Sequence, residues 1–237
     1  MKTDLKVTLL SYPRNADQLV ASAAKLCYSS KDIQQIINDN SDKESIGKFL
    51  DMLSESGHGS PFEHINFTFG IEGVSRALTH QLVRHRIASY SQKSQRYVNE
   101  SNFDYVIPND IEVNDETRYL FEKIMEDIQK SYDELVALGV TKESARYVLP
   151  NACETKIVMT MNARSLFNFF NHRCCLRAQT EIREMAYAML KEVKKVAPET
   201  FKKAGAYCKN LGYCPEGKMS CGLYPTLDYI KQQKNNI

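Results

Sequence analysis

The sequence predicts an α+β protein in which a mixed or antiparallel sheet is flanked by long helices. Three segments carry this prediction. Residues 64–71 and 153–162 each alternate apolar and polar positions, as strands with one buried face do. Residues 115–138 instead repeat apolar residues every three or four positions and end at Gly139, which is typical of a long amphipathic helix.

The apolar positions of these segments are the predicted core. They are Ile65, Phe67, Phe69 and Ile71 in the first strand, Ile157, Met159 and Met161 in the second, and Leu120, Ile124, Ile128, Tyr132 and Leu135 along the helix. The same two periodicities predict the other elements. They are a strand over residues 5–10 and helices over 15–27, 44–55, 142–149, 164–172 and 179–196.

The last of these helices is amphipathic and is followed by Pro198. Its predicted inner face consists of Ile182, Ala186, Met189 and Val193. No repeat and no low-complexity linker interrupts the chain. We therefore expect one domain over residues 1–237, of which 206–237 form a C-terminal extension containing Cys and Gly.

Composition excludes several classes of protein. The 237 residues hold 31 Lys and Arg against 29 Asp and Glu, and a net charge of +2 is too small for a protein that coats nucleic acid. Aromatic residues at 10% and charged residues at 25% exclude wholesale disorder. No segment approaches the roughly 20 apolar residues of a membrane span, and the first apolar run is too short for a signal peptide. We expect a cytoplasmic protein without membrane or nucleic-acid partners.

Seven cysteines, an odd number in a protein expected to be cytoplasmic, predict reduced thiols. Cys27 falls on the apolar stripe of its helix, so a buried, inert thiol is expected there. Two interpretations stay open for the five cysteines from residue 174 onward, which are Cys174, Cys175, Cys208, Cys214 and Cys221. Buried or free thiols are favoured because no CxxC pair occurs. A zinc or iron–sulfur site requires Cys174 or Cys175 to pack against the C-terminal extension.

The small net charge hides an uneven distribution. No Asp or Glu lies between Glu72 and Glu100, a stretch of 27 residues, and a second acid-free stretch runs over residues 155–180. The cations and histidines of the two stretches are Arg76, His80, Arg84, His85, Arg86, Lys93 and Arg96, and Lys156, Arg164, His172, Arg173 and Arg177. Arginines among Ser, Asn and Gln side chains favour a nucleotide-like ligand. The arginines can bind an anion, and the neighbouring amides and hydroxyls can recognise the hydrogen-bond donors and acceptors of a base or ring beside it. The alternative is a pair of solvated faces balanced by acids elsewhere in the fold.

Within the first stretch, Arg84-His85-Arg86, seven residues and then Ser94-Gln95-Arg96 resemble the RHR-x7-S-x-R signature of the flavin-dependent thymidylate synthases. Further segments agree with the family in order. They are 57–64 (GHGSPFEH), 145–150 (ARYVLP) and 162–166 (NARSL), with Arg173 and Gln179 beyond them. The resemblance covers residues 5–205.

The resemblance implies an enzyme that reductively methylates dUMP to dTMP. Methylenetetrahydrofolate would supply the carbon, FAD would carry the hydride, NADPH would reduce the flavin, and tetrahydrofolate would be released. It also implies a homotetramer whose sites are assembled at subunit interfaces. No Gly-rich dinucleotide turn occurs in this sequence, which excludes a Rossmann-type flavin site.

Site residues follow by the same resemblance. Arg173 would be the catalytic residue, placed at the pyrimidine edge, where a cation stabilises negative charge that develops on the ring. The dUMP ligands would be Gln81, Arg84, Gln92, Ser94, Gln95, Arg96, Arg146 and Arg173. The FAD ligands would be His58, Ser60, Arg84, His85, Arg86, Gln92, Asn162, Arg164 and Asn168, and no metal ligand is implied.

The chain departs from the family pattern at two positions. Some members carry Glu where this chain has Gln92, and an amide can donate a hydrogen bond but cannot act as a base. Arg177 stands where other members carry His.

Other functions compete for the same residues. An RNA- or DNA-binding module would use the same Arg, Ser and Gln side chains. A thymidylate synthase that uses a catalytic cysteine is disfavoured, since no Cys here lies in that family's motif. His58 and His64 fit no standard zinc spacing, and Ser94 has no nearby Asp to orient His85 as its base. His80 is expected to be structural.

Overall fold

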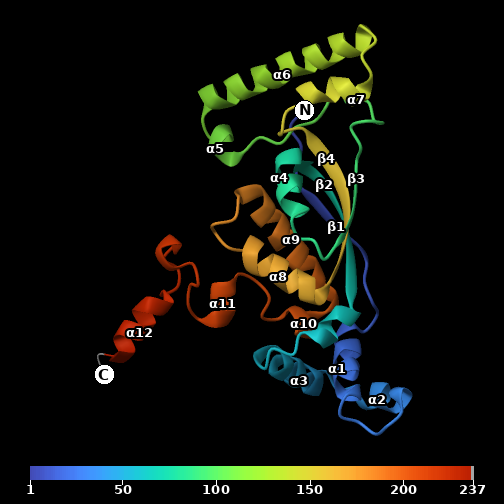
Figure 1. Cartoon of the computed structure of the whole chain (residues 1–237), viewed down its shortest axis with the longest axis vertical. Helices are drawn as coiled ribbons and strands as arrows, with labels where there is room; N and C mark the ends of the chain where they lie inside the picture. The colour runs from blue at the N-terminus through green and yellow to red at the C-terminus, as the bar shows by residue number, and fades with distance from the viewer. Residues whose placement is uncertain (236–237) are drawn as a thin grey trace. The chain divides into compact units, whose positions relative to one another are not determined.

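The computed structural model describes residues 1–235 and contains a four-stranded antiparallel sheet in the order β1-β2-β4-β3 (Figure 1). The strands are β1 (Lys6–Ser11), β2 (Asn66–Ser75), β3 (Ser89–Gln92) and β4 (Glu154–Asn162). The alternating apolar residues of β2 and β4 that the sequence assigns to the core are all buried. The α+β class and the three predicted strands are confirmed.

Twelve α-helices and three short 3-10 helices are found within residues 1–235. The α-helices are α1 (Ala16–Leu26), α2 (Ile33–Asp39), α3 (Lys43–Glu55), α4 (Arg76–Leu82), α5 (Asn109–Glu112), α6 (Asp115–Ala137), α7 (Lys142–Ala145), α8 (Ala163–Arg173), α9 (Thr180–Val196), α10 (Pro198–Phe201), α11 (Tyr207–Leu211) and α12 (Leu227–Asn235). The 3-10 helices are η1 (Ser60–His64), η2 (Arg146–Val148) and η3 (Gly217–Met219). Each helix predicted from periodicity is present, with 142–149 divided between α7 and η2. α2, β3, α5 and the helices after α9 were not predicted from the sequence, whereas the helical stretch expected around His80 is present as α4.

The chain divides into two compact units. Unit 1 consists of residues 1–8 and 69–159, and unit 2 consists of residues 9–68 and those from 160 onward. β1, β2 and β4 each contribute residues to both units. The two units are described separately below.

Unit 1 has a small core beneath α6. Phe103, Met125 and Cys153 are buried together, and Phe121 and Ile128 pack against them. α6 also packs against α7 and η2, and it begins at Asn114, whose side chain accepts hydrogen bonds from the next helical amides.

The predicted apolar stripe of α6 is only partly right. Tyr132 is fully buried, but Leu120 is 58% exposed and Ile124 is 44% exposed. The apolar band of α6 is wider than the surface that unit 1 offers to cover it, so part of the band faces outward.

Unit 2 contains a cluster of phenylalanine rings around α10, packed edge to face or tilted. Phe201 on α10 packs against Phe67, with ring centroids 5.3 Å apart, and against Phe167 and Phe170 on α8. α1 packs on α2, α3 and α10, and α8 packs on α9. The predicted inner face of α9 is buried in full, which confirms that prediction.

One burial prediction is wrong. Cys27 follows the last residue of α1 and its thiol side chain is exposed, because the helix ends one residue earlier and the stripe does not continue. Over residues 1–235, no helix combines the length and apolar character needed to cross a bilayer.

Candidate functional site

The site residues implied by the resemblance are divided between the two units, nine in unit 1 and six in unit 2. In unit 1, α4 leads to the first of them. Ser75 caps the helix by accepting a hydrogen bond from the Leu78 amide at 3.0 Å, and the first helical amides donate to the carbonyls of Cys153 and Asn151. The direction of α4 is therefore fixed by the residues just before β4, and the helix delivers Gln81 and the turn after it.

The turn that follows α4 carries Arg84, His85 and Arg86. The Tyr90 hydroxyl lies 2.9 Å from the carbonyl oxygens of both Leu82 and His85 and shares its single proton between them, which closes the turn. Burial raises the pKa of Tyr90 to about 12, so this clamp stays protonated at physiological pH. Arg84 and Arg86 are both exposed, and within residues 1–235 neither forms an ion pair. A rigid turn thus presents two free guanidinium groups.

Gln92 ends β3 and points its amide into unit 1. Its Nε2 donates to the Thr79 hydroxyl on α4 at 3.0 Å and to the Thr155 hydroxyl on β4 at 3.2 Å. Both threonines are buried. The amide therefore ties three elements together in a half-buried position, where a carboxylate could not donate these bonds.

The segment after β3 places Ser94 half-buried and Arg96 exposed. The Arg96 guanidinium pairs with Glu143 on α7 at 2.9 Å, and the Nε of Arg146 donates to the Glu143 carbonyl at 3.1 Å. Two of the predicted phosphate ligands thus bond to the same residue, Arg96 through the exposed Glu143 carboxylate and Arg146 through the Glu143 backbone carbonyl. Gln95 differs from them, because its side chain is buried and donates to the Cys153 sulfur at 3.5 Å.

In unit 2, the turn at residues 57–60 carries the predicted ligands His58 and Ser60. Gly57 has φ of +74°, which favours glycine, and the His58 amide donates to the Leu53 carbonyl at 2.9 Å. Arg164 lies over this turn, since a Cβ added to Gly59 would be 3.1 Å from its Nε. The Arg164 guanidinium also pairs with Glu63.

α8 carries the remaining predicted ligands of unit 2. Asn162 is the N-cap, and its side-chain oxygen accepts from the Ser165 amide at 2.8 Å, so that oxygen is already used. Arg164 and Asn168 lie four residues apart and therefore share one exposed face. Arg173 is the last residue of α8; it is half-buried, and burial lowers the pKa of its guanidinium.

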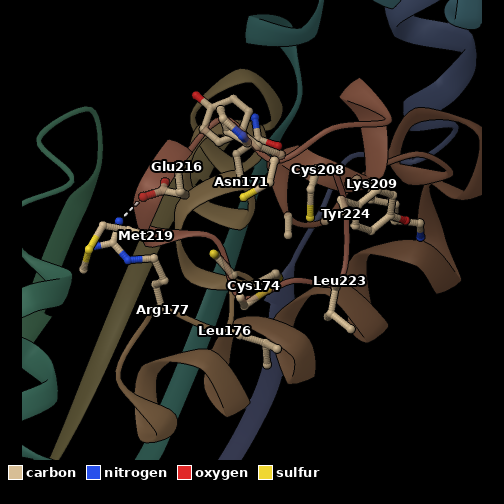
Figure 2. A pocket seen from close by; sticks show the side chains of 18 of the residues that line it. Asn171, Cys174, Leu176, Arg177, Cys208, Lys209, Glu216, Met219, Leu223 and Tyr224 are labelled. Carbon is tan, nitrogen blue, oxygen red and sulfur yellow. Dashed lines mark hydrogen bonds and ion pairs between the residues drawn. The ribbon is translucent and has the colours of Figure 1, made fainter. Parts of the chain in front are cut away.

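A cavity of about 330 Å³ lies next to the end of α8 in unit 2 (Figure 2). Its lining includes the five cysteines from Cys174 to Cys221, together with apolar and tyrosine side chains. Arg177 pairs with Glu216 across its edge, as the dashed line in Figure 2 shows. Burial raises the pKa of the Cys174 thiol to about 12. The pKa of the Cys208 thiol is also raised, mainly by burial and to a smaller extent by the neighbouring thiols of Cys175 and Cys214.

The packing that a metal site would need is thus present, because Cys174 and Cys175 line one cavity with the C-terminal extension. The arrangement of the donors does not match a metal site, however. Within residues 1–235, no three or more His, Cys, Asp or Glu side chains are grouped so that they could hold a metal ion. All seven cysteines are free thiols, as the odd number predicts.

Within residues 1–235, the two acid-free stretches contain some cations that are paired with acids and some that are not. Acids from distant parts of the sequence neutralise Lys93, Arg96, Lys156, Arg164 and Arg177. Arg84 and Arg86 are without such partners over residues 1–235. The prediction of two wholly free anion surfaces is therefore too broad, because spacing along the chain does not show which distant acids fold back onto a cation.

Sequence reasoning missed the acids that hold the signature segment. Glu143, Glu100 and Glu154 all lie outside the acid-free stretches, and the latter two pair with Lys93. In the sequence, Lys93 stands out only by its place between Gln92 and Ser94 in the motif. That place does not show which acid pairs with it.

Comparison with known proteins identifies relatives of the whole chain. A sequence family described as "Thymidylate synthase complementing protein" matches residues 8–199. A flavin-dependent thymidylate synthase of Clostridium tetani is 55% identical over 92% of this chain and 93% of its own length. One of Nitratidesulfovibrio vulgaris is 48% identical over 94% and 97%. Among solved structures, a UMP/dUMP methylase PolB from Streptomyces cacaoi bound with 5-Br dUMP aligns with a TM-score of 0.73 and 25% identity, over 84% of this chain and 94% of that one.

Proposed function

Because the chain belongs to the flavin-dependent thymidylate synthase family, and is therefore a methyltransferase that uses a flavin, we propose the full reaction that follows. The enzyme methylates dUMP to dTMP, with methylenetetrahydrofolate as the carbon donor. FAD is the flavin, NADPH is the reductant, and tetrahydrofolate is released. The bound flavin supplies the redox chemistry, and the residues of the chain bind and orient the reactants.

The observation that carries the proposal is the turn at Arg84-His85-Arg86. Its two guanidinium groups are exposed and without ion pairs in the part of the chain described, and the Tyr90 clamp holds the turn in shape. Exposed arginines on a fixed turn are suited to phosphate oxygens, which they can bind in a bidentate manner. The donor set fits a flavin diphosphate, and we assign Arg84, His85 and Arg86 to it.

The dUMP phosphate is assigned to the segment that follows β3. Ser94 offers a hydroxyl, and Arg96 and Arg146 offer guanidinium groups that Glu143 holds close to one another. A phosphate dianion competes well with the exposed Glu143 carboxylate for Arg96, because exposed ion pairs contribute only about 1 kcal/mol or less. Arg146 bonds to the backbone carbonyl of Glu143 and not to its carboxylate. Gln81 completes this set, and the buried side chain of Gln95 leaves only its backbone to take part.

Arg173 is assigned to the pyrimidine ring. Methyl transfer requires negative charge to develop on the uracil ring, and a cation at the ring edge stabilises that charge. Partial burial of Arg173 strengthens such an interaction, since fewer water molecules screen it. Gln92 has no acid–base role in this scheme, because a carboxamide neither gains nor loses a proton near neutral pH and its nitrogen is bonded to Thr79 and Thr155.

In unit 2, the turn at 57–60 and the exposed face of α8 are assigned to the flavin. His58, Ser60, Arg164 and Asn168 present polar groups there. Asn162 retains only its amide nitrogen for a ligand, because its oxygen caps α8. As in the family, we propose a homotetramer, which light scattering coupled to gel filtration tests directly.

The absorption spectrum of the purified protein is the first test. A yellow protein whose flavin bands change on addition of dUMP, and which forms dTMP from dUMP and methylenetetrahydrofolate, supports the proposal. A colourless protein that takes up no FAD contradicts it. Binding to oligonucleotides with a steep dependence on salt would instead indicate a nucleic-acid-binding module.

Two variants test the assignment of the turn. Arg84→Ala and Arg86→Ala are expected to lose flavin during gel filtration, because each removes an unpaired guanidinium group. Arg118→Ala is the matched control, since it removes an arginine of the same unit that is paired only with its helix neighbour Asp115. Equal flavin content in all three variants would contradict the assignment.

A further inference from the structure

The signature segment is anchored in unit 1 by a half-buried lysine that pairs with two buried glutamates. The Lys93 ammonium lies 3.2 Å from Glu100 Oε2 and 3.4 Å from Glu154 Oε2. The lysine side chain is 21% exposed and the two glutamate side chains are 3% and 7% exposed, so the cluster is nearly dry. The lysine was a candidate for the anion-binding surface in the sequence, and the structure contradicts this, because its charge is neutralised inside the unit.

Each carboxylate is fixed by a different part of unit 1. Glu154 lies at the start of β4, and its second oxygen accepts from the Gly73 amide on β2 at 3.1 Å. The Glu100 backbone is held by α6, since its amide donates to the Tyr132 hydroxyl at 3.2 Å and its carbonyl accepts from Gln129 at 3.3 Å. Lys93 thus binds at once to the central strands and to the long helix.

Each charge in this cluster depends on the opposite charges beside it. Burial lowers the pKa of Lys93, but the two glutamates outweigh this effect and raise it overall. Burial raises the pKa of Glu100, and its Oε1 has no hydrogen-bond partner over residues 1–235. Such clusters contribute little net stability, because the cost of desolvation offsets the attraction between the charges. Stability alone therefore does not explain why a lysine stands here.

Alternation along the segment suggests what the lysine does. Lys93 and Gln95 point into unit 1, toward the two glutamates and Cys153, whereas Arg96 is exposed. Ser94 lies between the two inward side chains, and its carbonyl closes the next turn by accepting from the Val98 amide at 3.0 Å. Lys93 and Gln95 hold this short segment in place. Of the signature residues, Ser94 lies between these two anchors and Arg96 follows directly after them.

We propose that Lys93, through Glu100 and Glu154, is a positioning residue that sets Ser94 and Arg96 for the phosphate of dUMP. This inference rests on the proposed function, since it specifies how the phosphate part of that site is held. Lys93 itself does not touch the substrate. Its effect is to pre-organise donors, so it acts on the phosphate part of the affinity and not on the chemical step.

The test compares dUMP with deoxyuridine, which lacks the phosphate. In Lys93→Met we expect the preference for dUMP over deoxyuridine, measured by calorimetry on the flavin-loaded enzyme, to fall at least tenfold. KM for dUMP should rise by a similar factor while kcat at saturating dUMP stays within about threefold. Lys93→Arg, which can reach both glutamates, should recover most of the preference.

Lys156→Met is the matched control. Lys156 lies on β4, its carbonyl accepts the Lys93 amide at 2.9 Å, and its exposed ammonium pairs only with Glu72. The control removes one positive charge near the segment and leaves the buried cluster intact, so its dUMP preference should stay within twofold of wild type. If Lys93→Met does not fold, Glu100→Gln weakens the same cluster without changing its shape and should lower the preference at least threefold.

The outcomes separate the two proposals. If wild type binds dUMP and the phosphate preference is unchanged in Lys93→Met, or in Glu100→Gln where the former does not fold, the positioning role is refuted and the proposed function stands. If both kcat and the affinity for deoxyuridine fall as much as the affinity for dUMP, the cluster is merely structural and the inference is again refuted. If wild type binds neither nucleotide, the proposed function fails and takes this inference with it.

Discussion

Replacing Gln92 by Glu tests whether the amide at this position is a structural requirement. The Gln92 amide donates to the hydroxyls of Thr79 and Thr155, at 3.0 and 3.2 Å. The Thr79 hydroxyl already donates its proton to the Arg76 carbonyl at 3.0 Å, so it can only accept from residue 92. A carboxylate would therefore face an oxygen lone pair at Thr79, while the Thr155 hydroxyl could rotate to donate.

The magnitude follows from these contacts. Loss of a donor to a buried acceptor costs about 1 to 3 kcal/mol, and rotation of Thr155 limits the loss to one of the two bonds. We expect Gln92→Glu to lower the free energy of unfolding by about 2 kcal/mol at pH 8, measured by urea denaturation. Gln34→Glu is the control, because Gln34 is exposed and bonds only to Asn38 on the same helix. Its effect should stay within about 0.5 kcal/mol.

The same variant predicts a dependence on pH. Burial raises the pKa of the introduced carboxyl above its unfolded value of about 4.3, so the folded state binds the proton more tightly. Stability from that proton is fully present below the unfolded pKa and is lost as pH rises through the folded pKa. The deficit of Gln92→Glu against wild type should therefore shrink between pH 8 and pH 5. A variant as stable as wild type, or a deficit that is equal at both pH values, would refute the role assigned to the two hydrogen bonds.

Three further predictions follow from other parts of the structure. Arg173→Ala should lower kcat for dTMP formation at least about 100-fold while the protein stays yellow, and near-normal turnover would exclude a role at the ring. Cys27 should react with iodoacetamide within minutes and Cys174 far more slowly, as peptide mass spectrometry shows, because only Cys174 is buried and has a pKa of about 12; equal rates would contradict the structure. Gly73→Ala should destabilise the protein by about 3 kcal/mol or more in urea, since φ is +68° and the new Cβ would overlap the Asp4 carbonyl; a change below about 1 kcal/mol would argue against this backbone geometry.

Elements with a strong hydrophobic period could be predicted from the sequence. β2, β4 and α9 bury the residues that their periods select, because each lies against a core that covers its whole apolar face. α6 was predicted with nearly correct ends, but Leu120 and Ile124 are exposed. Periodicity shows that a face is apolar and does not show how much of that face the rest of the unit covers.

Strand β3 could not be predicted in this way. Its residues, Ser89–Gln92, are polar or aromatic, and they alternate between exposed and half-buried positions without an apolar period. It is an edge strand whose pairing is decided by β4, over sixty residues later in the sequence. α2 is a similar case, because only Ile36 of its seven residues is buried.

The candidate site could likewise be predicted only in part. The signature named the residues of the Arg84 turn and of the segment ending at Arg96, because a motif records which side chain types stand at a fixed spacing. The signature did not identify Glu100 or Glu143, because the sequence around a cation does not show which acid will pair with it in the fold. One sequence therefore shows the candidate ligand groups more readily than the groups that hold them in place.

The net charge of +2 illustrates how such anchoring groups shape the site. Seven of the eleven arginines lie in the two acid-free stretches, yet acids from outside those stretches neutralise Arg96, Arg164 and Arg177. Arg84 and Arg86 differ from these three because they have no ion-pairing acid in the part of the chain described, and they differ from the half-buried Arg76 because they are exposed. The Tyr90 hydroxyl bonds to backbone carbonyls at both ends of the turn that carries these two cations. If the proposed assignment of this turn to the flavin diphosphate is right, a variant that loosens the turn, such as Tyr90→Phe, should weaken flavin binding without changing any charge.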